Sequence, residues 1–99
     1  MLVNLTPHVV NVAGRAIPST GLARVGMVRV RAGEADGVPV FSTVLGTVVG
    51  LPDETAGTWF IVSRVVAGAA PGRGDLLVPG GLVRNAAGVV VGCDGFDRP

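Results

Sequence analysis

The sequence contains no lysine and no tyrosine, and it has a single histidine and a single cysteine. With Cys93 alone, no disulfide can form within the chain, and one cysteine with one histidine cannot complete a structural zinc site. Three phenylalanines and one tryptophan do not provide the row of stacking aromatics that proteins binding single-stranded nucleic acid use. We therefore expect no metal, no cofactor and no nucleic-acid partner.

Charge is also scarce: charged residues make up 15% of the chain, and the net charge is +1. Such a balance produces no overall field that would draw the protein to nucleic acid or to an acidic membrane. All eight basic residues are arginine. GC-rich coding is the simpler explanation, and the alternative is selection for forked guanidinium groups that hold carboxylate or phosphate.

Long apolar runs are absent too. No stretch reaches the roughly 18 residues that a membrane-spanning helix needs, and Met1-Leu2-Val3-Asn4 does not begin a signal peptide. We expect a cytoplasmic protein without membrane contact. The 99 residues predict one domain, residues 1–99, with one core. A hydrophobic fraction of 48% then indicates either compact folding or apolar surface hidden in a homo-oligomer.

What is abundant is valine, punctuated by 16 glycines and 7 prolines. Valine favours strands, while glycine and proline mark turns. The pattern predicts an all-β fold, a small barrel or sandwich of six to eight short strands, with at most one short helix. The expected strands are residues 9–12, 15–18, 22–31, 38–49 (one strand, or two broken near Gly46), 58–62, 76–78, 82–84 and 89–92.

Several local expectations follow from residue order. Alternating Val28 and Val30 with Arg29 and Arg31 predicts a strand with one apolar side and one basic, wet side. Residues 58–62 predict a central buried strand with Trp59 and Phe60 in the core, and residues 94–99 a frayed tail. Ser63 is a candidate cap for a helix that Pro71 would end, and Asp36-Gly37 is a turn signal.

The candidate ligand-binding residues lie at the ends of predicted elements: His8, Arg64, Arg73, Asp75 and Arg84. Arg73 lies between two glycines, and a glycine-flanked loop with an arginine can hold an anion. The alternative is that Arg73 pairs with Asp75 and fixes the loop. No glycine-rich phosphate motif accompanies these residues.

Catalytic chemistry has less support in the sequence. His8 is the only imidazole, and Asn4-Leu5-Thr6-Pro7-His8 equally predicts a structural turn held by the Asn4 and Thr6 side chains. Cys93 follows a predicted strand, a position typical of a small buried residue, and we assign it no catalytic role. Arg24, Arg29 and Arg31 are better explained as a solvated strand face than as a phosphate site.

A resemblance covers nearly the whole chain. It is carried by Asn4-Leu5-Thr6-Pro7-His8, Gly57-Thr58-Trp59-Phe60-Ile61-Val62-Ser63, Pro71-Gly72-Arg73-Gly74-Asp75 and the closing phrases Pro79-Gly80, Val83-Arg84-Asn85-Ala86-Ala87-Gly88 and Val91-Gly92-Cys93. Together these phrases resemble a family of small phage, prophage and bacterial proteins that begin with an Asn-Leu-Thr-Pro-His phrase. The resemblance implies a phage-type context, and it transfers no activity and no site residue.

Three functions remain open at this point. The first is a non-catalytic binding module that recognises an anionic small molecule or a protein partner through the residues above. The second is a structural or assembly homo-oligomer of a phage-type element, which the high apolar fraction and low charge favour. The third is an enzyme using His8, for which no spacing in the chain sets out a catalytic constellation.

Overall fold

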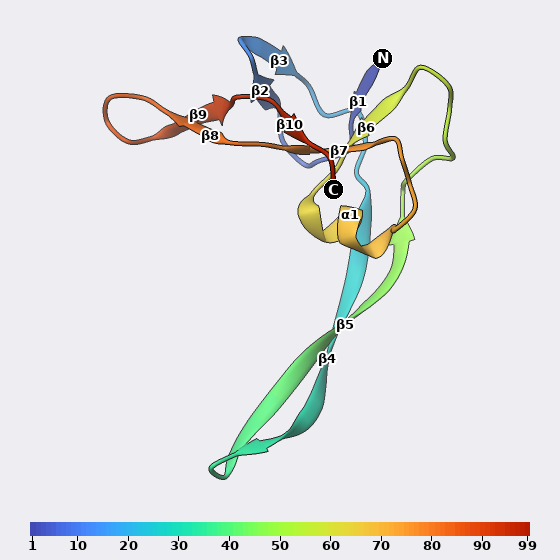
Figure 1. Ribbon diagram of the computed structural model, residues 1–99, viewed down its shortest axis with the longest axis vertical. Helices are drawn as coiled ribbons and strands as arrows, with labels where there is room; N and C mark the ends of the chain where they lie inside the picture. Colours follow the sequence, from blue (N-terminus) through green and yellow to red (C-terminus); the bar gives the residue numbers. More distant parts are fainter.

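The computed structural model describes all residues, 1–99, as a body from which one long two-stranded arm projects (Figure 1). Ten strands and one helix follow in this order: β1 (Leu2–Asn4), β2 (Val10–Val12), β3 (Arg15–Ile17), β4 (Arg24–Ala35), β5 (Val38–Val49), β6 (Trp59–Ile61), α1 (Arg64–Ala69), β7 (Leu76–Pro79), β8 (Leu82–Arg84), β9 (Val90–Cys93) and β10 (Phe96–Asp97). The prediction of an all-β fold with one short helix is confirmed.

The body contains two four-stranded sheets, with strand orders β1-β6-β7-β10 and β3-β2-β9-β8. In the first sheet β6 pairs in parallel with β1 on one side and with β7 on the other. The second sheet joins two hairpins, β2–β3 and β8–β9, through a short parallel contact between Val12 and Cys93. Every strand of the body has two to four residues, which is what frequent glycine and proline allow.

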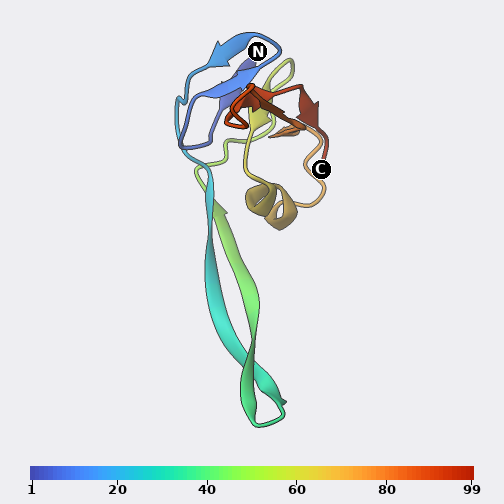
Figure 2. The ribbon, with the colours of Figure 1, turned by 90° about the vertical axis from the view of Figure 1, so that its left-hand side faces the viewer.

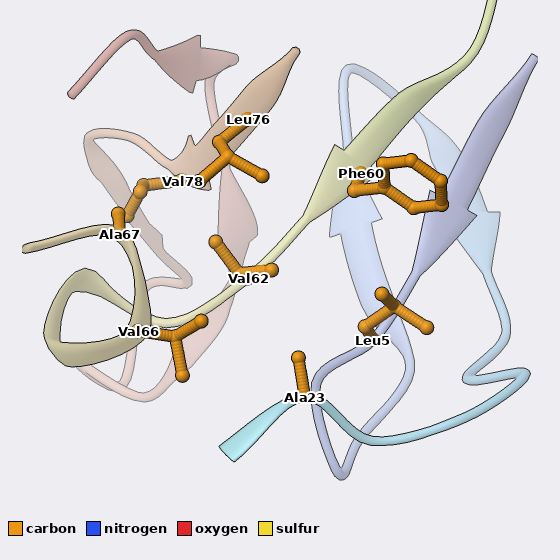
Figure 3. Packing of buried hydrophobic residues seen from close by; sticks show 8 residues of the cluster. All are labelled: Leu5, Ala23, Phe60, Val62, Val66, Ala67, Leu76 and Val78. Carbon is orange, nitrogen blue, oxygen red and sulfur yellow. The ribbon is translucent and has the colours of Figure 1, made fainter. Parts of the chain in front are cut away.

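The core lies on both faces of β6, because successive strand residues point to opposite sides. Phe60 and the following Val62 belong to a cluster with Leu76 and Val78 of β7, shown in Figure 3. Ile61 points the other way, into a cluster with residues of the second sheet, Val10, Val12, Ile17 and Cys93. The first sheet is therefore covered on one face by the second sheet and on the other by α1 and the base of the arm.

The helix α1 has the boundaries that the sequence indicates. The Ser63 side chain accepts a hydrogen bond from the backbone N–H of Val66 and caps the first turn. Val66 and Ala67 are buried against the first cluster, and the helix ends at Ala69, two residues before Pro71. The predicted cap and stop are both confirmed.

The arm consists of β4 and β5, each 12 residues long, joined by the two-residue turn Asp36-Gly37 (Figure 2). Both turn residues have positive φ, 50° and 78°, as a tight hairpin turn requires. The register shifts twice, at Gly46-Thr47 of β5 opposite Gly26 and at Ala32 of β4, and such bulges increase the twist of the ribbon. The arm raises the radius of gyration to 16.5 Å, against about 13 Å for a compact chain of this length.

Four expectations from the sequence need correction. The strands number ten, and two of them are long; residues 38–49 form one strand, with a bulge near Gly46. The tail is not frayed, since β10 pairs with β7. Trp59 lies at the margin of the core with 37% of its surface exposed. Finally, Val28 and Val30 do alternate with arginines, but both sides of their strand face solvent.

One polar side chain ties the N-terminal segment together. Asn4 is fully buried at the end of β1, and its Nδ2 donates to the backbone carbonyls of His8 and Ile17, at 2.9 Å each. Its Oδ1 accepts from the backbone N–H of Thr6 at 2.9 Å and from the Thr6 hydroxyl at 2.6 Å. The side-chain amide of Asn4 therefore finds all four of its hydrogen-bond partners inside the protein, as a buried amide requires. The Asn-Leu-Thr-Pro-His phrase is thus the structural turn that its side chains predicted.

We expect Asn4→Ala to lower the free energy of unfolding by roughly 2–4 kcal/mol, because the buried Ile17 carbonyl loses its donor and the Thr6 N–H loses its acceptor. Urea unfolding followed by circular dichroism measures this. Asn85→Ala is the matched control: the Asn85 side chain accepts from two backbone N–H groups in the exposed β8–β9 turn. Water can replace it there, so we expect a loss of about 1 kcal/mol or less. Equal losses in the two variants would contradict the role given to Asn4.

Candidate functional site

The strongest ion pair of the body joins Arg73 and Asp75. Arg73 Nε donates to Asp75 Oδ1 at 2.9 Å, and Nη2 donates to Oδ2 at 2.8 Å, which is the bidentate arrangement. Nη2 also donates to the carbonyl of Pro52 at 2.8 Å, and Glu54 lies 3.5 Å from Nε. Arg73 therefore clamps the loop before β7 to the loop before β6, the second of the two roles that the sequence left open.

This pair is shielded from water, with 21% of the Arg73 side chain and 11% of the Asp75 side chain exposed. The hydrogen bond from Arg73 holds the pKa of the Asp75 carboxyl below its ordinary value, more than burial raises it. The same bond raises the pKa of Arg73, which stays protonated. The guanidinium is thus committed to a carboxylate of its own chain.

Arg64 and Arg84 also hold partners within the chain. Arg64, in the first turn of α1, donates to Asp97 of β10 at 2.8 Å, with both side chains more than half exposed. Arg84 donates to the carbonyl of Gly88 at 2.9 Å and closes the β8–β9 hairpin. Each arginine thus supports the local backbone or the tail rather than facing an open cavity.

His8 lies in the exposed segment between β1 and β2, and its imidazole makes no hydrogen bond. It borders an open depression of about 620 Å³ whose other lining is mainly apolar, from Val9, Val10, Leu82, Val90 and Val91. Cys93 also borders this depression, but its thiol donates to the carbonyl of Asn11 at 3.5 Å. No carboxylate lines the depression, so no acidic side chain there orients His8 as a general base.

The five candidate residues do not form one site. His8 lines one depression, Asp75 lines another of about 370 Å³ beside Trp59, and Arg64, Arg73 and Arg84 line no cavity. No group of three or more histidine, cysteine or acidic side chains is arranged to hold a metal ion. The body therefore presents local structural pairs, without a concave place where the arginines converge.

Sequence reasoning missed two features outside these candidates. Asp97 and Arg98 were assigned to a frayed tail, yet Asp97 pairs with Arg64, and the Arg98 guanidinium lies 5.6 Å from the Trp59 ring centre. The second feature is the arm, whose residues 24–49 take about a quarter of the chain without burying it. The length of two uninterrupted alternating segments around Asp36-Gly37 was the available signal for it.

In comparisons with known proteins, no family model, no curated protein and no solved structure matches this chain. The helix α1 is not long and apolar enough to cross a membrane.

We expect Arg73→Ala to lower the free energy of unfolding by about 2–3 kcal/mol, because it leaves the Asp75 carboxylate buried and unpaired. The matched control is Arg64→Ala, which removes an exposed ion pair and should change stability little. Thermal and urea unfolding of both variants measure the difference. If the two variants had the same free energy of unfolding, the Arg73 clamp would not stabilise the fold.

The depressed pKa of Asp75 also predicts a dependence on pH. A carboxyl whose pKa is lower in the folded state stabilises the fold above its unfolded pKa, about 3.9. That contribution is lost as pH falls through the lower, folded pKa. Asp75→Asn lacks it at every pH, so between pH 5 and 2 its unfolding free energy should fall less steeply than that of the wild type. Parallel acid profiles would rule out this contribution.

Proposed function

We propose that this protein is a structural, non-catalytic module that assembles with further copies of itself, and that the β4–β5 arm makes the contact. One observation carries the proposal: a 26-residue ribbon, residues 24–49, leaves the body with apolar side chains open to solvent along its length. Large apolar areas on a small protein are typical of interaction surfaces.

The exposed area supports assembly in amount as well as in kind. The chain exposes 6388 Å², whereas a compact protein of 9.9 kDa exposes about 5,200 Å². The surplus of about 1,200 Å² exceeds the roughly 800 Å² that each partner contributes to a standard protein interface. One chain thus has enough excess surface for a stable contact without opening its core.

The arm is also a sheet of only two strands, β4 and β5, with no third strand beside them. A single two-stranded hairpin is marginally stable in water, and three or more strands or a packed face are needed for independent stability. Only the base of the arm meets the body, where Val25 and Val48 pack against the core cluster that contains α1 residues. The outer part gains order when a partner covers it, and assembly would provide that cover.

An anion-binding module is the weaker candidate. It would rest on His8, Arg64, Arg73, Asp75 and Arg84, and each of the three arginines already holds a carboxylate or a carbonyl of its own chain. An incoming anion would have to displace Asp75 from Arg73 and leave a shielded carboxylate unpaired, which is costly. An enzyme using His8 lacks a carboxylate in the same depression.

For the biological setting we propose the phage-type context that the resemblance in the sequence implies. A phage-type family of small proteins that begin with an Asn-Leu-Thr-Pro-His phrase suits an assembly role, because such elements build repeated structures from many copies of short chains. The Arg73 clamp holds the carbonyl of Pro52, three residues after the end of β5, and so fixes the segment by which the arm returns to the body.

We expect native mass spectrometry of the purified protein to show a discrete homo-oligomer without a bound small molecule. In a shortened variant, Met27 is joined to Leu45 through the Asp36-Gly37 turn, which keeps the paired base of the arm. This variant should be monomeric and should retain the circular dichroism of the body. A monomeric wild-type protein, or an oligomer that survives the shortening, would overturn the proposed function.

A further inference from the structure

The two faces of the arm differ in chemistry. Residues directly opposite each other in an antiparallel pair share a face, so the register assigns the paired side chains of the outer arm, residues 27–45. One face contains only uncharged residues: Val28, Val30, Gly33, Ala35, Val38, Val40, Ser42 and Val44. We name it the valine face. The other, the mixed face, contains Met27, Arg29, Arg31, Glu34, Pro39, Phe41, Thr43 and Leu45.

The charges of the mixed face are satisfied within the ribbon. The Arg29 guanidinium lies over the Phe41 ring, 3.8 Å from its centre, and covers part of the largest apolar side chain of the arm. Arg31 pairs with Glu34 across the bulge at Ala32. These contacts let the mixed face remain in water, and they confirm that its residues point the same way.

The valine face has no such cover. Its five valines are between 42% and 63% exposed, and Ser42 is its only polar side chain. At the base of the arm, Met27 of the mixed face borders the same depression as Val65 and Val66 of α1. The valine face therefore begins on the side of the ribbon that is turned away from α1, where nothing in the body reaches it.

We infer that the valine face packs against the valine face of a second copy of this chain, so that two arms stack as ribbons about a two-fold axis. The inference rests on the proposed function and specifies its contact. A face without charge is complementary to itself, because superposing it on its copy opposes no like charges. Rows of β-branched side chains at the strand spacing also interdigitate well between stacked sheets. The paired charges of both mixed faces then remain outside.

The test compares two neighbouring positions of β5 that point to opposite faces. Val44→Glu places a carboxylate on the valine face, and Thr43→Glu places the same group on the mixed face. We expect Val44→Glu to raise the dissociation constant of the dimer roughly 100-fold or more, since two carboxylates would be buried together. Thr43→Glu should leave it within about threefold. Sedimentation equilibrium of the full-length proteins measures both.

The outcomes separate the inference from the proposed function. A wild-type monomer would overturn both. A wild-type oligomer that Val44→Glu leaves intact would overturn the inference alone, and would indicate that the arms join by their free edges or that the β8–β9 hairpin makes the contact. Equal weakening by both substitutions would also overturn it, because the contact would then not distinguish the faces.

A second measurement covers the case in which Val44→Glu fails to fold. Ser42→Cys lies near the middle of the valine face, and Thr43→Cys is its neighbour on the mixed face. A short bis-maleimide should link Ser42→Cys into a covalent dimer far more efficiently than Thr43→Cys. The wild-type protein, whose Cys93 is buried, gives the background. Equal linking at both positions would contradict face-to-face stacking.

Discussion

The strand β6 is the element on which the rest of the body depends. Although β6 is only three residues long, it pairs with both β1 and β7. It also contributes Phe60 to one core cluster and Ile61 to the other. Ile61 and Val62 are completely buried. Because a short strand cannot hold a sheet by itself, the second sheet on one face and α1 on the other are both needed. The Arg73 contacts fix the loops that lead into β6 and β7, and the Asn4 contacts fix the segment after β1 against the end of β3.

Local chemistry made much of this structure predictable. The Ser63 cap, the stop before Pro71 and the Asp36-Gly37 turn depend on interactions within a few residues, so the sequence indicates them directly. The strand β1 and the strand β10 were not expected, because each exists only through pairing with a strand far along the chain. Such pairing leaves no periodic signal in three or two residues.

The candidate site shows where prediction from residue types ends. Glycines around Arg73 indicate an exposed arginine, but Asp75 two residues later can claim the same guanidinium, and only the placement of Pro52 and Asp75 decides between them. The alternation in β4 was read correctly as two faces, and the burial of one face was inferred from the usual behaviour of sheets. That rule presumes a second layer. Here no second layer covers the outer arm, and nearly every residue of β4 and β5 is exposed on both faces.

The distribution of charge along the arm distinguishes a contact surface from a solvated projection. A ribbon meant to stay in water places charged residues on its faces and edges to prevent association. In its outer part, residues 27–45, the strands of this ribbon have Arg29, Arg31 and Glu34 on one face and no charged residue on the other. In the outer arm the valine face offers only apolar side chains and Ser42 to its surroundings, whereas the charges of the mixed face have partners within the ribbon, and this difference favours the valine face as the proposed contact.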